Sequence, residues 1–465
     1  MIIFRRCRSA LACMAALGCA LLLSAGCARQ AASSGGSTVS VGDADGSLSA
    51  STENMDFSYT DNDLDASYDE ANATRITLSG DAVTVDGTGA SVSGTTVTIT
   101  GGGTYLLSGT LDNGRVIVDA DGQKLWLVLD GAAIRCQSGP GALYIRSADK
   151  VFLLLAPGSE NSLADSEGDD LAAEESNVDA ALFSKADLTI NGTGSLTVTG
   201  AAHGIVCKDE LVFTDGVLTV DAAADGIQGK DSVKIRAGTL HITASDDGIN
   251  GAGGADGSAL GGRPGQNGFG SGNSSLRIAD GYIVVDASGD GIDVNGSLSI
   301  EGGTVLVTGP SDSGNGAFDY DGSATVSGGV VICVGASGMA QGFSDTSAQP
   351  SAMVTLSTRG AAGETVALTD ADGNVLAAFT PTRTWQTAVI SAPGMTVGGT
   401  YTLYTGGSLS AANDDGFADS GTLTGGTAAQ TFTLSSVSTT VGSAGGMNPG
   451  GGGMNPGGGM GGFGR

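Results

Sequence analysis

Aspartate and asparagine side chains recur at fixed intervals between residues 225 and 321 of this chain. Asp225, Asp247 and Asp290 begin three similar segments, and three residues after each stands an amide or a carboxylate side chain. Calcium is a hard cation that takes about 6–8 oxygen ligands from groups of these kinds. The sequence therefore predicts calcium sites with the candidate ligands Asp225, Asp246, Asp247, Asn250, Asp290, Asp293, Asn295, Asp319 and Asp321. The alternative is that Asp-Gly serves turn formation and its carboxylates are solvated.

The same segments repeat a pattern of apolar residues. Counted from His203, Asp225, Asp247 and Asp290, with a 21-residue insertion after Asp247 left out of the count, position +2 is always isoleucine, position +13 is always glycine, and positions +8, +10, +15 and +17 are apolar. The first two steps are 22 residues long, and the third is 43 because of an insertion near residues 251–272. Alternation directs every second side chain to one face of a strand. A coil of this size cannot bury its apolar face alone, so the coils must stack.

We therefore predict an all-β fold, a right-handed parallel β-helix over residues 74–345, with β-rich closing coils or a small cap at residues 346–441. An antiparallel sandwich is the alternative, but it does not require a repeat of the whole coil. Equal positions of stacked coils lie about 4.8 Å apart. Carboxylates at that spacing repel one another unless a cation lies between them, which favours the calcium interpretation.

Lysines occupy position +5 of the earlier coils, as Lys185, Lys208 and Lys230, and Asp209 and Asp231 follow two of them. The simplest interpretation is a structural network of ion pairs, although these lysines are also candidates for contact with a carbohydrate. A calcium-dependent polysaccharide lyase would need a metal ion to acidify a uronate proton and a basic side chain to remove it. Lys230, or else Lys208, is the candidate base under that alternative, and the binding interpretation predicts no catalytic residue.

The two ends of the chain differ from the repeats. Residues 1–26 have three arginines and then an apolar run, and small residues precede Cys27; this resembles a bacterial lipoprotein signal, which implies a lipid on Cys27 and a protein exported to the cell surface, with the lipid as its only membrane contact. Residues 27–73 are predicted to be an acidic flexible tether, and residues 442–465 a disordered tail of Gly, Met, Asn and Pro.

Charge and cysteine content exclude several classes of function. Removal of residues 1–26 takes away three arginines and no acid, and lowers the formal net charge from −29 to −32. Such a chain is not expected to bind nucleic acid, which requires clustered lysine and arginine. The cysteines beyond Cys27 are Cys136, Cys207 and Cys333, without the spacing of a metal site or a dense disulfide framework, and we interpret them as buried apolar residues. We expect a monomer.

Several stretches resemble the bacterial carbohydrate-binding β-helix proteins that are related in fold to polysaccharide lyases. They are residues 103–109, 127–131, 142–144 and 184–190, together with the Asp-Gly-Ile coils, and they span roughly residues 74–335. The resemblance implies an exported surface protein that binds calcium and plant cell-wall polysaccharide, either pectin or cellulose, without established cleavage. His203, where an aspartate is typical, and the insertion at residues 251–272 depart from the family pattern.

The net charge bears on which polysaccharide is expected. An acidic protein repels a polyuronate, so binding an acidic glycan requires calcium as a bridge. Aromatic residues make up only 5% of the chain, so a flat platform for neutral cellulose has few candidates, chiefly Tyr282 and Tyr320. The sequence thus favours calcium-bridged binding of a polygalacturonate-type glycan. The alternatives are a pectate lyase and a surface adhesion or scaffold protein without glycan affinity.

Overall fold

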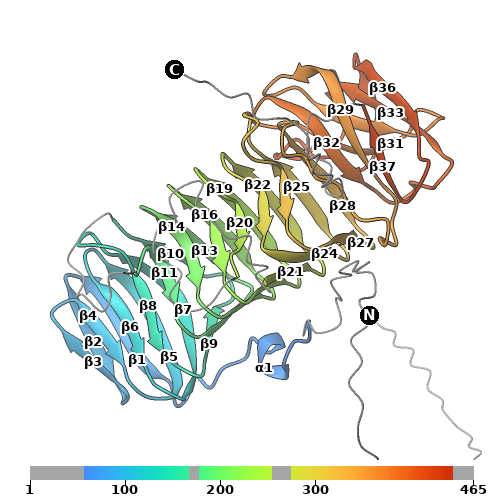
Figure 1. Cartoon of the computed structure of the whole chain (residues 1–465). Helices are drawn as coiled ribbons and strands as arrows, with labels where there is room; N and C mark the ends of the chain where they lie inside the picture. Colours follow the sequence, from blue (N-terminus) through green and yellow to red (C-terminus); the bar gives the residue numbers. More distant parts are fainter. Residues whose placement is uncertain (1–56, 167–176, 254–273, 443–465) are drawn as a thin grey trace, which may run out of the picture. The chain divides into compact units, whose positions relative to one another are not determined.

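The computed structural model describes residues 57–166, 177–253 and 274–442. Within these ranges the chain is built from strands, with one short helix, so the prediction of an all-β fold is confirmed (Figure 1). The predicted signal segment, Cys27, most of the tether, most of the insertion and all but the first residue of the tail lie outside the described residues. No helix in the described ranges is long and apolar enough to cross a membrane.

From Ala180 onward each coil contributes three strands, one to each of three stacked sheets. The strands of the first sheet are β3 (Ala90–Ser93), β4 (Thr96–Ile99), β6 (Arg115–Asp119), β8 (Leu143–Ser147), β11 (Ala180–Ser184), β14 (His203–Cys207), β17 (Ile227–Gly229), β20 (Ile249–Gly251), β23 (Ile292–Val294) and β26 (Phe318–Tyr320). All neighbours in this sheet pair in parallel except β3 with β4.

The second and third sheets contain the other two strands of each coil. The second consists of β9 (Lys150–Leu155), β12 (Asp187–Gly192), β15 (Glu210–Phe213), β18 (Ser232–Ile235), β21 (Ser274–Ile278), β24 (Gly296–Ile300) and β27 (Ala324–Val326). The third consists of β10 (Glu160–Ala164), β13 (Ser195–Gly200), β16 (Val217–Ala222), β19 (Thr239–Ala244), β22 (Tyr282–Ala287), β25 (Thr304–Thr308) and β28 (Val330–Gly335).

These two sheets join at the N-terminal end of the stack. The long strand β7 (Lys124–Arg135) pairs with β9 through its first half and with β10 through its second half. The strands β1 (Thr74–Gly80), β2 (Ala82–Asp86) and β5 (Gly103–Leu111) continue the stack beyond β7, and β1 with β2 forms an antiparallel pair at the end.

The register of the coils is the one that the repeat predicts. Ile205, Ile227, Ile249 and Ile292 face one another in successive strands of the first sheet, and all are at most 2% exposed. The insertion between β20 and β21 does not change this register. The glycine at position +13 has a positive φ in every coil, for example 106° at Gly216, and a side chain would strain the turn between the second and third sheets there.

The chain beyond β28 changes from parallel to antiparallel pairing and forms a cap rather than further coils. The strands β29 (Ser351–Gly360), β32 (Trp385–Ser391) and β37 (Ser438–Val441) extend the sheet of β28. A second sheet contains β31 (Val375–Phe379), β30 (Val366–Thr369), β33 (Thr400–Thr405) and β36 (Thr427–Thr433), and β34 (Ser408–Leu409) pairs with β35 (Leu423–Thr424). Trp385 and Leu368 share an apolar core with Leu306 of the coil stack.

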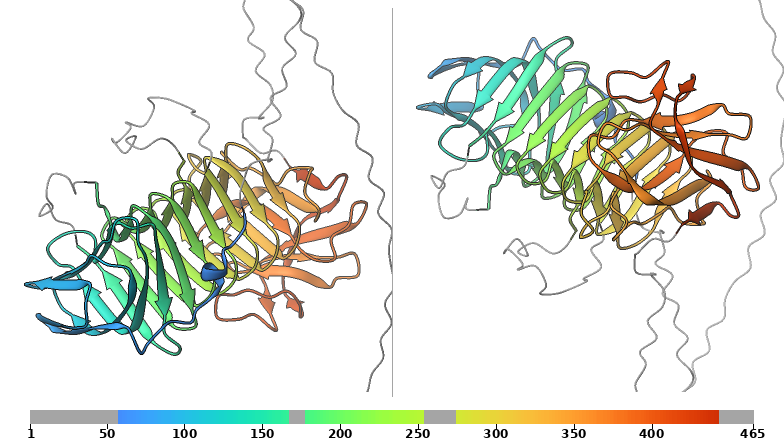
Figure 2. Two further views of the ribbon diagram at one scale, coloured as in Figure 1. Left: turned by 90° about the horizontal axis from the view of Figure 1, so that it is seen from below. Right: turned by 90° about the horizontal axis from the view of Figure 1, so that it is seen from above.

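Residues 57–73 form a strap along the outer side of the second sheet. The strap contains α1 (Asp61–Leu64), and the left view in Figure 2 shows this blue segment lying across the green strands. Tyr68 and Ala73 pack against the outward apolar side chains of Val128 and Phe152. Residues 57–73 belong to the segment that was predicted to be a flexible tether, and in the structure they contact the coils along the second sheet.

Candidate metal site

The predicted metal ligands lie where the chain turns from the third sheet into the first. Here the side chain of each coil accepts a hydrogen bond from the backbone N–H of the next coil. Asp225 N–H donates to His203 Nδ1 at 3.2 Å, Asp247 N–H to Asp225 Oδ1 at 3.2 Å, and Asp290 N–H to Asp247 Oδ1 at 2.7 Å. Gly316 N–H then donates to Asp290 Oδ1 at 2.5 Å. We call this row the acceptor ladder, and His203 takes the aspartate role in it through Nδ1.

The glycines that follow these aspartates serve the close approach of neighbouring coils. A Cβ on Gly226 would lie 2.3 Å from Ile242 Cγ2 and 2.6 Å from the carbonyl oxygen of Gly248. Gly248 would meet Val285 and Gly291 in the same way. Gly226 and Gly248 do not have a positive φ, so backbone conformation does not explain why glycine stands there. The Asp-Gly pairs therefore reflect stacking as well as hydrogen bonding, and the explanation by turn chemistry alone is incomplete.

A second column runs beside the ladder on the outer side of the first sheet. Gln228, Asn250, Asp293 and Asp319 occupy equal positions in successive strands. Gln228 Nε2 and Asn250 Nδ2 each donate to Asp225 Oδ2 at 3.3 Å. Asn250 Nδ2 also reaches Asp247 Oδ2 at 3.2 Å, whereas its Oδ1 is buried without a hydrogen-bond partner among the described residues.

Three carboxylates beside this column, two of them from the acceptor ladder, come close enough together to share one cation. Asp225, Asp246 and Asp247 each present an oxygen, and these oxygens lie within 4.8 Å of one another. Asp225 is buried, Asp247 is half-buried and Asp246 is exposed, so the group opens to solvent on one side. We call these three residues the acidic cluster, and the cluster together with the second column the acidic column.

Burial and mutual repulsion disfavour the charged form of several acids here. Burial first, and the neighbouring charges of Asp225 and Asp290 second, raise the pKa of Asp247 to about 8. The pKa of Asp293 is raised to about 7 and that of Asp290 to about 6, again by burial first and by neighbouring carboxylates second. A cation with oxygen ligands would remove this repulsion.

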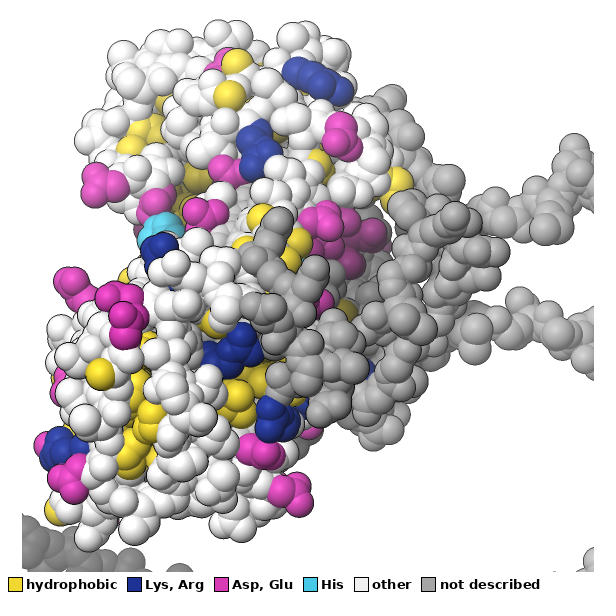
Figure 3. All heavy atoms as spheres, turned by 90° about the vertical axis from the view of Figure 1, so that its left-hand side faces the viewer, with side chains coloured by type: hydrophobic (Ala, Val, Ile, Leu, Met, Phe, Trp, Pro, Cys, Tyr) yellow, Lys and Arg dark blue, Asp and Glu magenta, His cyan; other side chains and the backbone are white. Residues whose placement is uncertain are grey.

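The remaining predicted ligands extend the column toward the cap. Asn295 Nδ2 donates to the carbonyl oxygen of Ala252 at 2.8 Å, and Asp319 Oδ1 accepts from Gln341 Nε2 at 2.5 Å. Asp321 is exposed and contributes to the raised pKa of Asp293. In the space-filling view, acidic side chains gather in groups (Figure 3).

The lysines of position +5 lie at the opposite edge of the first sheet. Lys185 Nζ lies 5.6 Å from the ring centroid of Tyr144, and Lys208 Nζ lies 5.5 Å from that of Phe183. Lys208 Nζ also donates to Gln228 Oε1 at 3.2 Å, which connects it to the second column. Lys230 occupies the equivalent turn after β17.

The two tyrosines proposed for carbohydrate contact do not join this group. The Tyr282 hydroxyl donates to Asp415 Oδ2 at 2.8 Å and accepts from Asn413 Nδ2 at 2.7 Å, so a loop of the cap engages it. The Tyr320 hydroxyl donates to the carbonyl oxygen of Gly342 at 2.5 Å, and its ring packs on the core. Their positions do not support an aromatic platform beside the lysines.

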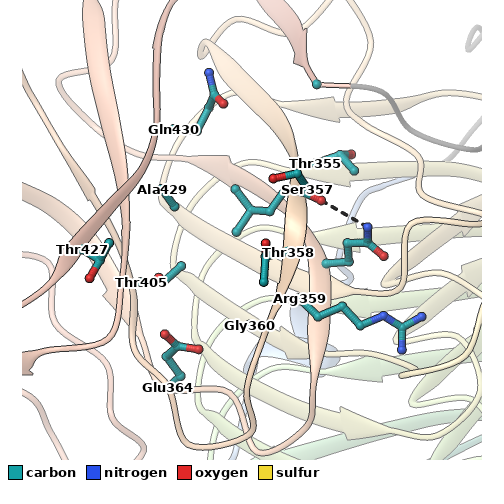
Figure 4. A pocket seen from close by; sticks show the side chains of 13 residues that line it. Thr355, Ser357, Thr358, Arg359, Gly360, Glu364, Thr405, Thr427, Ala429 and Gln430 are labelled. Atoms are coloured by element: carbon teal, nitrogen blue, oxygen red, sulfur yellow. Dashed lines mark hydrogen bonds between the residues drawn. The ribbon is translucent and has the colours of Figure 1, made fainter.

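Sequence reasoning did not identify a cleft between the two sheets of the cap. It has a volume of about 600 Å³ and is lined mainly by hydroxyl and amide side chains, including Thr355, Thr427 and Gln430 (Figure 4). Arg359 at its rim donates to the carbonyl oxygen of Ser311 at 3.3 Å. Threonine-rich alternation in the cap strands is the only related signal in the sequence.

Comparisons with known proteins connect this architecture to carbohydrate binding. Residues 93–261, which include the acidic cluster, match the model of a family described as carbohydrate-binding domain-containing protein. A curated protein with that description, from Acetivibrio thermocellus, is 38% identical over 118 residues, which are 24% of this chain and 41% of that protein. The matched part thus spans about two fifths of the length of that relative.

A solved structure described as the polysaccharide lyase-like protein from C. thermocellum, in a gadolinium derivative, is also similar. It is 31% identical to this chain, with a TM-score of 0.47, and the match covers 55% of this chain and 99% of that one.

Proposed function

We propose that this chain, of which residues 93–261 match the model of the carbohydrate-binding domain-containing family, binds an acidic polysaccharide through calcium ions held by the acidic column. The observation that carries the proposal is the acidic cluster, in which oxygens of Asp225, Asp246 and Asp247 converge within 4.8 Å. Three carboxylates alone would repel an acidic sugar. A cation bound by them can hold the carboxylate of that sugar.

The residues present fit calcium better than a softer metal. All candidate ligands in the cluster and the second column are carboxylate or amide oxygens, which calcium prefers. Asn250 Oδ1 is buried beside the cluster without a hydrogen-bond partner in the described ranges, so it is available as a further ligand. The raised pKa values of Asp247 and Asp293 are those expected of a site whose carboxylates need a compensating charge.

The overall charge favours a bridged mode of binding. The chain carries a formal charge of −29, so a polyuronate approaches it against repulsion. Calcium supplies positive charge that the protein and the glycan share. In this arrangement the buried Asp225 and the half-buried Asp247 would hold the ion, and the exposed Asp246 marks the side from which a sugar carboxylate would approach. Lys208, at the edge of the same column, would pair with a second carboxylate of the glycan.

We also infer that the coil stack is a right-handed parallel β-helix and that the protein is exported and anchored by a lipid on Cys27. The parallel pairing of successive coils in three sheets supports the first inference. The basic and apolar residues before Cys27 support the second. Under these two inferences, the acidic column lies on an extended support outside the cell.

Affinity electrophoresis tests the proposal. The protein is run through gels containing polygalacturonate, with calcium and with a chelator. We expect retardation with calcium only, and its loss in the variant Asp225→Asn/Asp247→Asn. Asp372→Asn/Asp414→Asn is the matched control, because these two acids are exposed in the cap and the change in charge is the same. Equal mobility with calcium and with chelator would overturn the proposal.

The same samples separate binding from cleavage. A lyase that uses Lys230 or Lys208 as its base produces unsaturated uronate, which absorbs in the ultraviolet. We expect calcium-dependent retardation without new absorbance. New absorbance that disappears in Lys230→Ala or Lys208→Ala would instead identify a polysaccharide lyase.

A further inference from the structure

The strap covers the second sheet in two different ways. At its C-terminal end Tyr68 and Ala73 cover apolar side chains of β5, β7 and β9, which is an ordinary hydrophobic cover. Residues 57–65 instead lie over outward-facing polar and charged side chains of the coils. We call this group the cradle, and it consists of Lys150, Thr189, Asn191, Thr214 and Lys234.

In the cradle the coils supply the hydrogen-bond donors and the strap supplies the acceptors. Asp63 Oδ1 accepts from Lys150 Nζ at 2.9 Å and from Thr189 Oγ1 at 2.5 Å. The carbonyl oxygen of Asp63 accepts from Asn191 Nδ2 at 3.0 Å and from Thr214 Oγ1 at 3.1 Å. Figure 2 shows α1, which contains Asp63, over these strands.

The lysines of the cradle are unusually buried. The side chains of Lys150 and Lys234 are only 8% and 2% exposed. Lys234 Nζ pairs with Glu210 Oε2 at 2.5 Å and donates to the carbonyl oxygen of Ser58 at 3.1 Å, and Lys150 Nζ lies 3.4 Å from Glu210 Oε1. Two ammonium groups thus face one carboxylate of the coils, and Asp63 of the strap supplies the second.

A structural cover alone does not require this arrangement. Burying charged groups costs free energy, and apolar residues of similar volume often stabilise a protein as well or better. The same sheet uses such residues under Tyr68, at Val128 and Phe152. The hydrogen-bond donors of the cradle are arranged to bind one carboxylate with oxygen acceptors beside it. The Asp63 side chain and the carbonyl oxygens of the strap supply these groups.

We propose that the cradle is a binding site for a carboxylate-bearing sugar residue, and that residues 57–65 occupy it as an internal substitute. The proposal rests on the proposed function for the class of ligand but requires no calcium. When residues 57–65 lift, Tyr68 and Ala73 keep the strap attached. The sugar carboxylate then pairs with Lys150 and Thr189, and sugar oxygens accept from Asn191 and Thr214.

Binding of trigalacturonate to the full chain, measured by calorimetry in the presence of a chelator, tests this inference. Asp63→Ala removes the carboxylate that competes for Lys150, and Asp61→Ala is the matched control, because Asp61 is exposed in the same helix. A binding-competent minor state populated at 0.1–10% lowers apparent affinity in proportion. We expect Asp63→Ala to bind at least about tenfold more tightly than the wild type, and Asp61→Ala to bind like the wild type.

Equal affinity of Asp63→Ala and wild type, or equal binding of cellotriose by Asp63→Ala, would overturn the inference. Hydrogen exchange of the wild type provides a second measurement that needs no variant. Trigalacturonate, at the concentration that saturates Asp63→Ala, should accelerate exchange in residues 57–65, and unchanged exchange there would contradict displacement. Calcium-dependent retardation in polygalacturonate gels should persist in Asp63→Ala. If neither the wild type nor the variants show this retardation but trigalacturonate still binds, the proposal for the acidic column is refuted and the proposal for the cradle is not.

Discussion

Replacement of Asp247 by asparagine separates the two roles of the acidic cluster. The amide oxygen can still accept the Asp290 N–H, so the acceptor ladder is preserved, but the charge is lost. Burial raises the pKa of the Asp247 carboxyl from 3.8 to about 8, so the folded state binds more protons than the unfolded state between these values. Stability therefore falls as the pH rises through this window.

The size of the effect follows from the shift. Each pH unit between the unfolded pKa and the working pH costs about 1.4 kcal/mol, so taking up a proton on Asp247 during folding at pH 7 costs at most about 4 kcal/mol. Solvent screens the exposed part of this half-buried side chain, which lowers the expected cost to about 2 kcal/mol. In chelator, Asp247→Asn should therefore be more stable than the wild type by about 2 kcal/mol at pH 7, and nearly equal to it at pH 4.

Calcium should reverse this order, because it binds the folded wild type and compensates the charge. Binding at 100 times the dissociation constant stabilises a protein by about 2.7 kcal/mol, and the asparagine variant should gain much less. Urea unfolding followed by circular dichroism at pH 4.5 and 7.5, with calcium and with chelator, measures all four conditions. A variant less stable than the wild type in chelator at pH 7.5 would refute the repulsion argument. Asp372→Asn should show no such dependence.

Two further substitutions test the same region. Gly226→Ala should destabilise the protein by about 3 kcal/mol, because its Cβ would lie 2.6 Å from the Gly248 carbonyl oxygen, and urea unfolding should show this at every pH. His203→Asp should extend the acidic column by one carboxylate. In chelator its stability should fall more steeply than that of the wild type above pH 4, and calcium affinity measured by calorimetry should rise.

The repeated part of the fold was predictable because the same sequence pattern occurs in each coil. Alternating apolar residues and a glycine at position +13 are local signals, and copies such as Ile227 and Ile249 fix the register between coils. The acidic cluster was predictable for the same reason, since equal positions of stacked coils must lie side by side. The acceptor ladder was not predicted, because it depends on which side-chain oxygen reaches the next backbone amide.

Contacts between distant segments were beyond sequence reasoning. The strap resembles an acidic linker in composition, and nothing near Asp63 indicates that it pairs with the buried Lys150. The strands that begin near Leu125 and Val151 are apolar on both faces, which indicates a cover but does not identify the covering segment. Tyr282 was a reasonable candidate for sugar contact, but Asp415, from a loop 133 residues away, engages its hydroxyl.

The acceptor ladder has a direction, and this affects how such a protein can change its length. Each coil brings one side-chain acceptor for the coil that follows and one amide for the coil that precedes it. Duplication of a 22-residue unit, from Asp225 to Asp246, would therefore insert a matched donor and acceptor and leave no amide unpaired. At its far end the series reaches Gly316, which has no side chain to continue it. Adding a coil inside the stack thus leaves the hydrogen bonding of the acceptor ladder complete. Each new coil would add one more carboxylate to the row.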